Sequence, residues 1–224
     1  MTQQDTNPQA RHSDTVLYYI HDPMCSWCWG FKPVLRQLTQ QLPANVPLEY
    51  LLGGLAADTD QPMPAEMQQR ISATWKHIQQ VIPGTEFNFD FWTQCQPRRS
   101  TYIACRAVIV AEQMRPDMGM AMLDAIQHAY YLQARNPSDA ATLVALAEQL
   151  GLDIAQFEQQ LNAEQTQQAL QQQIDFARGI GADSFPSLYL LYRENYHGIV
   201  LDYNHADVIL EHINSLIQRD KTDQ

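Results

Sequence analysis

Two cysteines stand three residues apart in the stretch YIHDPMCSWCWG, at Cys25 and Cys28. An apolar run precedes them, and residues compatible with a helix follow them. At the first turn of a helix, unpaired N–H groups and the positive end of the helix dipole stabilise a thiolate. We therefore expect a lowered pKa for Cys25, which would make this thiol a nucleophile at neutral pH. Cys28, one turn along, would then resolve a mixed disulfide formed at Cys25.

A Cys-x-x-Cys pair is also half of a zinc site, so the remaining cysteines help to decide between the two interpretations. Cys95 and Cys105 are ten residues apart and do not form a second closely spaced pair. The sequence therefore predicts a redox-active pair, no metal site and no cofactor beyond the pair itself. We expect Cys105 to be a buried helical thiol and Cys95 to lie in a loop, while a disulfide between them under oxidising conditions stays open.

The elements that must position the pair follow from hydrophobic periodicity. Residues 15–21 are apolar on both faces, as in a central parallel strand. From Cys25 onward, apolar residues recur at helical spacing until Pro43. Residues 47–55 predict a second strand, which bends at the Gly53–Gly54 pair. The first part of the chain is therefore predicted to be β-α-β.

The middle of the chain has helical rather than alternating spacing in almost every long segment. The last part returns to strand spacing, with a hairpin followed by a helix. The predicted order is β-α-β, a helical block and then β-β-α. The segments expected as helices or strands in these two parts are 64–81, 100–114 with Ser100 as N-cap, 118–135, 138–150, 153–161, 165–178, 185–192, 196–200 and 205–218.

Four segments resemble the DsbA-like family of thioredoxin-fold thiol-disulfide oxidoreductases, in particular its cytoplasmic, FrnE-related branch. The resemblance spans nearly the whole chain beyond the N-terminal tail, and the first and last segments are its most specific. It implies a thioredoxin-like α/β fold with a large all-helical insertion, and it implies that Pro186 is a cis-proline facing the two sulfurs. The segments are HDPMCSWCWGF (21–31), RSTYIACRA (99–107), AYYLQARN (129–136) and GADSFPSLYL (181–190).

The predicted organisation is discontinuous. We expect a thioredoxin-like domain from residues 15–61 and 180–220, an inserted helical domain from 62–179, and a disordered tail at 1–14. The formal net charge of −11 disfavours nucleic acid and anionic membranes as partners. The N-terminus lacks the pattern of a secretory signal and no stretch predicts a transmembrane helix, so we expect a cytoplasmic protein without membrane contact.

Residues other than the two cysteines are expected to contact the substrate. A cis bond before Pro186 would turn the Phe185 backbone outward, where it could pair with an extended substrate chain. The alternative for Pro186 is an ordinary proline at a strand edge. Ser26 and Trp27 stand where strongly oxidising relatives have a dipeptide with a histidine, so we expect a less oxidising disulfide here. Trp27 is the better candidate for an exposed substrate platform.

Several other residues have both a functional and a structural interpretation. His21 could act as a substrate-site base or charge partner for the thiolates, or fill space at a strand end. Asp22 could accept a proton near Cys28 or simply form a turn. Arg98 and Arg99 could bind an acidic ligand such as a glutathione carboxylate, or be solvated surface residues. Two tyrosines and four methionines could cover a peptide groove above the pair, or belong to the core: Tyr130, Tyr131, Met114, Met118, Met120 and Met122.

The leading hypothesis is an enzyme, a protein-disulfide oxidoreductase or isomerase, with Cys25 as nucleophile and Cys28 as resolving thiol. Its substrates would be proteins or peptides that carry thiols or disulfides, and glutathione or the thioredoxin system would recycle the pair. One alternative is a glutathione-dependent isomerase or transferase for small molecules, although the second thiol argues against it. The other is a non-catalytic peptide-binding module.

Overall fold

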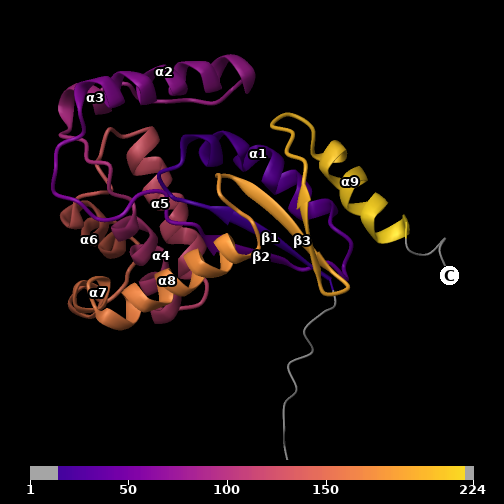
Figure 1. Cartoon of the computed structure of the whole chain (residues 1–224). Helices are drawn as coiled ribbons and strands as arrows, with labels where there is room; N and C mark the ends of the chain where they lie inside the picture. The colour runs from indigo at the N-terminus through magenta and orange to yellow at the C-terminus, as the bar shows by residue number, and fades with distance from the viewer. Residues whose placement is uncertain (1–14, 220–224) are drawn as a thin grey trace, which may run out of the picture.

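The computed structural model describes residues 15–219, so the expected tail at residues 1–14 lies outside the described residues. Four strands form one sheet: β1 (Thr15–His21), β2 (Leu48–Leu52), β3 (Ser187–Tyr192) and β4 (Asn195–Ile199). Their spatial order is β2-β1-β3-β4 (Figure 1). β1 pairs parallel with β2 and antiparallel with β3, and β3 forms an antiparallel hairpin with β4. The central position of β1 explains why both of its faces are apolar.

A long helical block separates the two pairs of strands in the sequence, and in Figure 1 it lies to one side of the sheet. The helices are α1 (Ser26–Gln41), α2 (Ala65–Val81), α3 (Phe91–Gln94), α4 (Tyr102–Met114), α5 (Met118–Tyr131), α6 (Ala140–Gln149), α7 (Ile154–Leu161), α8 (Glu164–Gly179) and α9 (Ala206–Arg219). The predicted order, β-α-β, helices and then β-β-α, is confirmed. The domain boundaries at residues 61 and 180 stay predictions.

Helices cover both faces of the sheet. Side chains alternate along a strand, so Leu17 and Tyr19 of β1 point to the face packed against α1 and α9. Val16 and Ile20 point to the opposite face, where Ala177 of α8 belongs to the same cluster. An amphipathic helix buries one stripe of its side chains. The stripe of α1 packs against this sheet face, so α1 begins close to the end of β1.

One local expectation in the helical block is wrong, and one short helix was not predicted. Ser100 is not the N-cap of α4, since Thr101 occupies that position. The Ser100 hydroxyl instead lies within hydrogen-bonding distance of Asp58, at 3.4 Å. The short helix α3 has no counterpart among the predicted elements, because four residues are too few to show a helical period.

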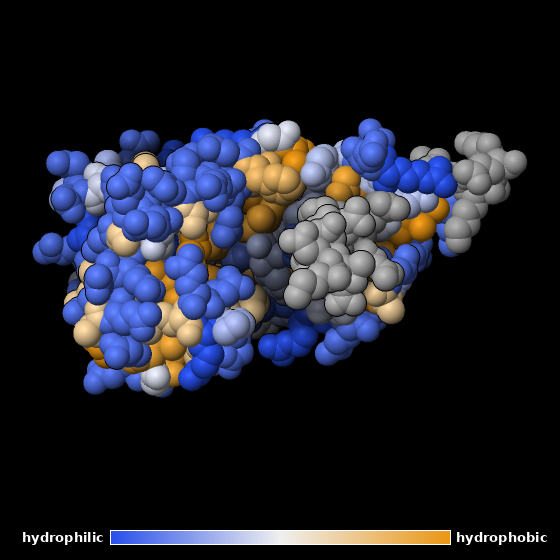
Figure 2. Space-filling view, turned by 90° about the horizontal axis from the view of Figure 1, so that it is seen from below, coloured by the Kyte–Doolittle hydropathy of each residue, from blue (hydrophilic) through white to orange (hydrophobic). Residues whose placement is uncertain are grey.

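Seen from the lower side of Figure 1, the visible surface is largely hydrophilic, with smaller hydrophobic areas between the hydrophilic residues (Figure 2). Within residues 15–219, none of the helices has the length and apolar character required to span a bilayer.

The end of β2 approaches neighbouring segments so closely that only glycine fits. A Cβ atom at Gly53 would overlap the ring of Phe185. Gly54 has a φ of +62°, in the left-handed region, and a Cβ there would overlap the side chain of Ile174 in α8. The expected bend at this glycine pair therefore also brings α8 and the loop before β3, which contains Phe185 and Pro186, against the sheet.

We predict that Gly54→Ala lowers the free energy of unfolding by about 2 kcal/mol or more, because it combines left-handed strain with overpacking. Gly151→Ala is the matched control, since Gly151 has a similar φ of +69° and a Cβ added there would meet no atom within 4 Å. The control should cost only about 1 kcal/mol. Urea unfolding measures both values, and equal losses would contradict the packing argument.

Candidate functional site

Cys25 is the N-cap residue of α1, with its side chain turned back onto the first turn of the helix. The Cys28 backbone N–H donates a hydrogen bond to Cys25 Sγ, at 3.3 Å. The first turn carries no acidic side chain, so the positive end of the helix dipole faces the sulfur. Both cysteines are free thiols. The pair is therefore arranged as the sequence predicts, with one sulfur at the helix tip and the other one turn along.

The loop before β3 lies opposite the pair. The Phe185–Pro186 peptide bond is cis, and Pro186 is buried. The Cys25 thiol donates to the Phe185 carbonyl oxygen, at 3.4 Å. The ladder between β1 and β3 ends at Ser187, which leaves the Phe185 backbone outside the sheet. A short extended chain could therefore lie beside Cys25 and pair with this backbone.

A pocket of about 200 Å³ opens beside the Cys25 sulfur. Cys25 is only 6% exposed, so access to the sulfur runs through this pocket. Expected site residues Ser26, Trp27 and Phe185 line it, as does Tyr130. The structure thus brings these predicted residues together, while Cys28 is 1% exposed and lies behind Cys25.

The residues that line the pocket also include two that the sequence interpretation missed. These two are Met24 and Met63, whereas the four methionines that the sequence suggested as a cover for the groove do not line this pocket. Of those, Met122 is fully buried in the core, and Met120 is exposed at another depression beside β2. Met24 follows directly from its position next to Cys25, but Met63 is far away in sequence and carries no signal that would have identified it.

Trp27 and Trp29 flank Cys28 and have different surroundings. Trp27 is half-buried, and its ring contacts His77 and Tyr203. Trp29 stacks on Tyr131, with the ring centroids 5.4 Å apart, and its indole N–H donates to the Glu86 carbonyl. Trp27 therefore borders the pocket, while Trp29 ties α1 to the helical block.

Asp22 is the polar centre beneath the pair and is completely buried. The backbone N–H groups of Met24 and Leu55 donate to its two carboxylate oxygens, at 2.8 and 2.7 Å. The Thr101 hydroxyl donates at 2.7 Å, and the Cys105 thiol lies at 3.4 Å. Burial raises the pKa of Asp22, although these hydrogen bonds act in the opposite direction.

Asp22 does more than form a turn, because its carboxylate accepts hydrogen bonds from three separate segments of the chain. Thr101 lies in the segment RSTYIACRA, on which the resemblance partly rests, but nothing in the sequence indicates that its hydroxyl faces Asp22. Burial also raises the pKa of the Cys105 thiol, so this thiol stays protonated and acts as a donor. Cys95 is a free thiol as well, and it donates to the Ala134 carbonyl, at 3.0 Å.

Cys28 lies in an environment that favours its neutral form. Burial is the largest cause that raises the pKa of its thiol, and the neighbouring Cys25 adds to the effect. A backbone hydrogen bond from Asp22 acts in the opposite direction, and the Asp22 carboxylate is close enough to repel a Cys28 thiolate. Cys28 therefore has to lose a proton before it can act as a nucleophile.

The expected role of His21 at the substrate site does not fit its position. Its side chain is 2% exposed and stacks on Tyr19, and it does not line the pocket. Burial lowers the pKa of His21 to about 4, so the imidazole is neutral at pH 7 and cannot act as a cationic partner for a thiolate. The space-filling interpretation of this strand-end residue is the better one.

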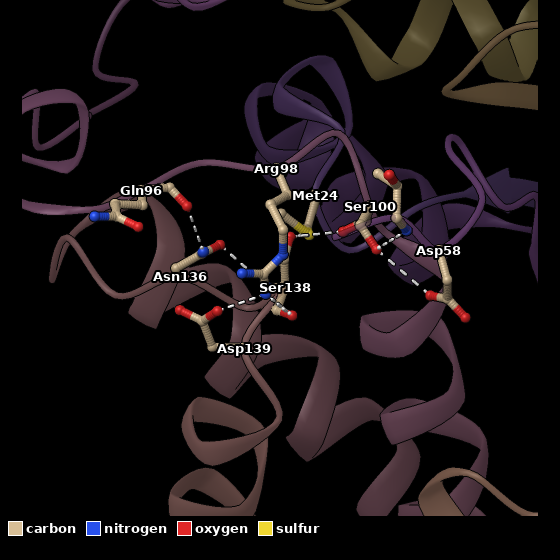
Figure 3. Close-up of polar contacts among 9 residues, drawn as sticks. Met24, Asp58, Gln96, Arg98, Ser100, Asn136, Ser138 and Asp139 are labelled. Atoms are coloured by element: carbon tan, nitrogen blue, oxygen red, sulfur yellow. Dashed lines mark hydrogen bonds and ion pairs between the residues drawn. The ribbon is translucent and has the colours of Figure 1, made fainter. Parts of the chain in front are cut away.

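The segment from Gln96 to Thr101 forms one wall of the pocket and is held by a polar network (Figure 3). Arg98 donates to the Ser138 carbonyl, at 2.6 Å, and to Asp139, at 2.5 Å. The Ser138 hydroxyl donates to the Ser100 carbonyl, at 2.6 Å. These contacts fasten the segment to the loop between α5 and α6, and Ser138 also approaches the Met24 sulfur. In the described part of the chain, no group of three or more His, Cys, Asp and Glu side chains could hold a metal ion.

Curated relatives of this chain carry the name ClpXP adapter protein SpxH. The protein of this name from Halalkalibacterium halodurans is 22% identical over 195 residues, which cover 85% of this chain and 63% of that protein. The one from Bacillus subtilis is 24% identical over 77% of this chain and 56% of that protein. The chain thus spans less than two thirds of the length of these relatives.

Solved structures with a similar fold are named for disulfide chemistry. A candidate protein disulfide isomerase from Nitrosomonas europaea is 26% identical, with a TM-score of 0.78, and the match covers 92% of this chain and 98% of that one. The cytosolic disulfide reductase DsbM from Pseudomonas aeruginosa is 22% identical, with a TM-score of 0.70 over 91% of this chain and 98% of that one. DsbM has also been solved with GSH.

A family model covers most of the chain. The model Thioredoxin_5, described as thioredoxin, matches residues 18–210, which include the cysteine pair, the helical block and the loop before β3. The chain therefore belongs to this thioredoxin family.

Proposed function

We propose that the protein is an enzyme that catalyses thiol–disulfide exchange, as an oxidoreductase or isomerase of protein and peptide disulfides. The observation that carries this proposal is the setting of the Cys25 sulfur, which lies between the Cys28 N–H and the Phe185 carbonyl at the edge of a pocket. The positive end of the helix dipole faces this sulfur, and the sulfur borders the space that a substrate would enter.

The reaction needs only the two cysteines and a substrate disulfide. The Cys25 thiolate attacks one substrate sulfur, which forms a mixed disulfide and expels the other substrate sulfur as a thiolate. The Cys28 thiolate then attacks the Cys25 sulfur, which forms the Cys25–Cys28 disulfide and releases the second substrate thiolate. Two electrons pass from the pair to the substrate, and the reverse sequence oxidises a substrate dithiol.

Asp22 is the group best placed to receive the proton of Cys28. Its carboxylate is buried beside the pair, and its raised pKa makes it a stronger base than an exposed aspartate. Cys28 needs such a base, because burial raises the pKa of its thiol well above the ordinary value. The proton would pass to Asp22 as Cys28 attacks the mixed disulfide.

Several features support peptide-like substrates and thiol partners. The Phe185 backbone lies outside the ladder of the sheet, which suits pairing with an extended chain, and the half-buried ring of Trp27 lines the same pocket. In the cytoplasm, which we propose as the location, the glutathione and thioredoxin systems would return the pair to the dithiol form. The DsbM structure with GSH supports glutathione as one such partner.

A second candidate function is that of an adapter that binds a protein without chemistry. The curated relatives named as ClpXP adapters favour it. The two functions differ in their need for the cysteines. Thiol–disulfide exchange needs both sulfurs, whereas binding of a peptide in the pocket needs neither. A variant with both cysteines changed to serine would keep partner binding if the adapter function holds, and would have no exchange activity in either case.

We predict that Cys25→Ser abolishes the reduction of insulin disulfides by dithiothreitol that the wild-type protein catalyses. Cys28→Ser should instead accumulate a mixed disulfide at Cys25, because the resolving thiol is missing. Insulin turbidity measures the first effect, and mass spectrometry under non-reducing conditions measures the second. Catalysis by Cys25→Ser at the wild-type rate would refute the assignment of the nucleophile.

We predict that Asp22→Asn slows the resolving step about tenfold or more at pH 7, because Cys28 loses its proton acceptor. The difference from wild type should shrink as the pH rises toward the raised pKa of the Cys28 thiol, because that thiol then ionises without a base. The measurement uses a thionitrobenzoate mixed disulfide at Cys25, from which attack by Cys28 releases coloured thionitrobenzoate.

Cys105→Ala is the matched control for this experiment. It removes one contact of the Asp22 carboxylate but keeps the carboxylate itself. Its resolving step should stay close to the wild-type rate at pH 7. An equal slowing in both variants, at all pH values, would show that Asp22 acts only through packing.

A further inference from the structure

Among the described residues, the charged side chains around the redox pocket are paired, with one exception. Arg98 is bound to Asp139, and Arg106 is bound to Asp58, at 2.6 Å. Asp22 is buried beneath the pair and does not face the pocket. Arg99 lines the pocket and has neither an ion pair nor a hydrogen bond among the contacts of residues 15–219. Within residues 15–219, one positive charge without an ion-pair partner therefore lines the pocket that contains Cys25, in a chain with a net charge of −11.

The backbone on both sides of Arg99 is held in place. Arg98 is tied to the loop between α5 and α6, and the Ser100 carbonyl accepts a hydrogen bond from Ser138 (Figure 3). Because its neighbours are fixed, the Arg99 side chain starts from a defined position on the pocket wall. It is half-buried, so a ligand there would be partly shielded from water.

Tyr130 lies within electrostatic range of both the Arg99 guanidinium and the Cys25 sulfur. Its ring lines the same pocket. Burial raises the pKa of Tyr130, the Arg99 charge acts to lower it, and the Cys25 charge acts to raise it. Both groups are thus within electrostatic range of one hydroxyl. A ligand that reacts at Cys25 would reach Arg99 across this tyrosine.

We propose that Arg99 is a specificity-determining residue that binds a carboxylate of a small thiol or disulfide whose sulfur reacts at Cys25. The ligand class is an acidic thiol of peptide type, with a carboxylate a few bonds from the sulfur; reduced glutathione is the probe. A guanidinium binds a carboxylate through two parallel N–H···O bonds, which would orient as well as attract the ligand. This inference rests on the proposed exchange function and names the substrate feature that the pocket selects.

The reaction that Arg99 would assist consumes two thiols. The first glutathione thiolate attacks the Cys25 sulfur of the oxidised pair, which forms a mixed disulfide and leaves Cys28 as a thiolate. A second glutathione thiolate attacks the glutathione sulfur, which releases glutathione disulfide and a Cys25 thiolate. The two glutathione molecules supply the two electrons, and Arg99 holds the carboxylate of the first one during its attack.

The test compares two thiols that differ only in their carboxylates. Reduced glutathione and its diethyl ester are each reacted with the oxidised full-length protein, and free protein thiols are trapped by alkylation over time. Wild type should react faster with glutathione than with the ester. Arg99→Gln should lower the rate constant with glutathione about tenfold, the size of one charge-assisted hydrogen bond, and change the rate with the ester less than about twofold. Arg99→Lys should recover part of the preference.

Arg36→Gln is the matched control, because Arg36 is an exposed arginine of α1 that does not line this pocket. It removes the same charge and should leave the preference for glutathione unchanged. An equal loss with both thiols in Arg99→Gln, or no loss with either, would overturn the role of Arg99. If neither thiol reduces the wild-type pair while the protein still catalyses insulin reduction by dithiothreitol, the role of Arg99 is overturned and the exchange function stands. If insulin reduction fails as well, the exchange function itself fails.

Discussion

The buried Asp22 carboxylate holds three separate segments together at the redox site. It accepts hydrogen bonds from the loop before α1, from Leu55 after β2, and from Thr101 before α4. The first two segments belong to the β-α-β part and the third to the helical block, so one side chain links the sheet to the insertion. Replacing such a buried acceptor by an apolar group would leave its donors unsatisfied. The position of the pair, the pocket wall and the start of α4 all depend on it.

The insertion is also tied to the redox helix by aromatic packing. Trp29 follows Cys28 directly and stacks on Tyr131 of α5. Tyr131 in turn contacts Trp75 of α2, which is fully buried among further aromatic rings. A shift of the insertion would therefore move Trp29 and the first turn of α1. The helical block is thus part of the scaffold that sets the geometry of the pair.

The fold could be predicted from the sequence because its signals are local or repeat at a fixed period. The apolar run of β1, the helical stripe after Cys25 and the strand that follows Pro186 identify the two parts of the sheet. The cysteine pair was identified by its spacing. For Asp22 and the two arginines the sequence offers a functional and a structural interpretation and cannot choose between them, because the choice depends on which partners the fold brings near. Arg98 and Arg99 are adjacent and chemically identical, yet only Arg98 meets a carboxylate among the described residues.

Gly53, which directly follows β2, has a consequence for the evolution of the site. The Phe185 ring occupies the space in which any side chain at position 53 would start. A larger residue there would require the Phe185 ring, which lines the redox pocket, to move, while both cysteines stay unchanged. The shape of the pocket and the identity of the nucleophile are therefore encoded at separate positions. Descendants of this chain could retune the size of acceptable substrates while their sulfur chemistry stays constant.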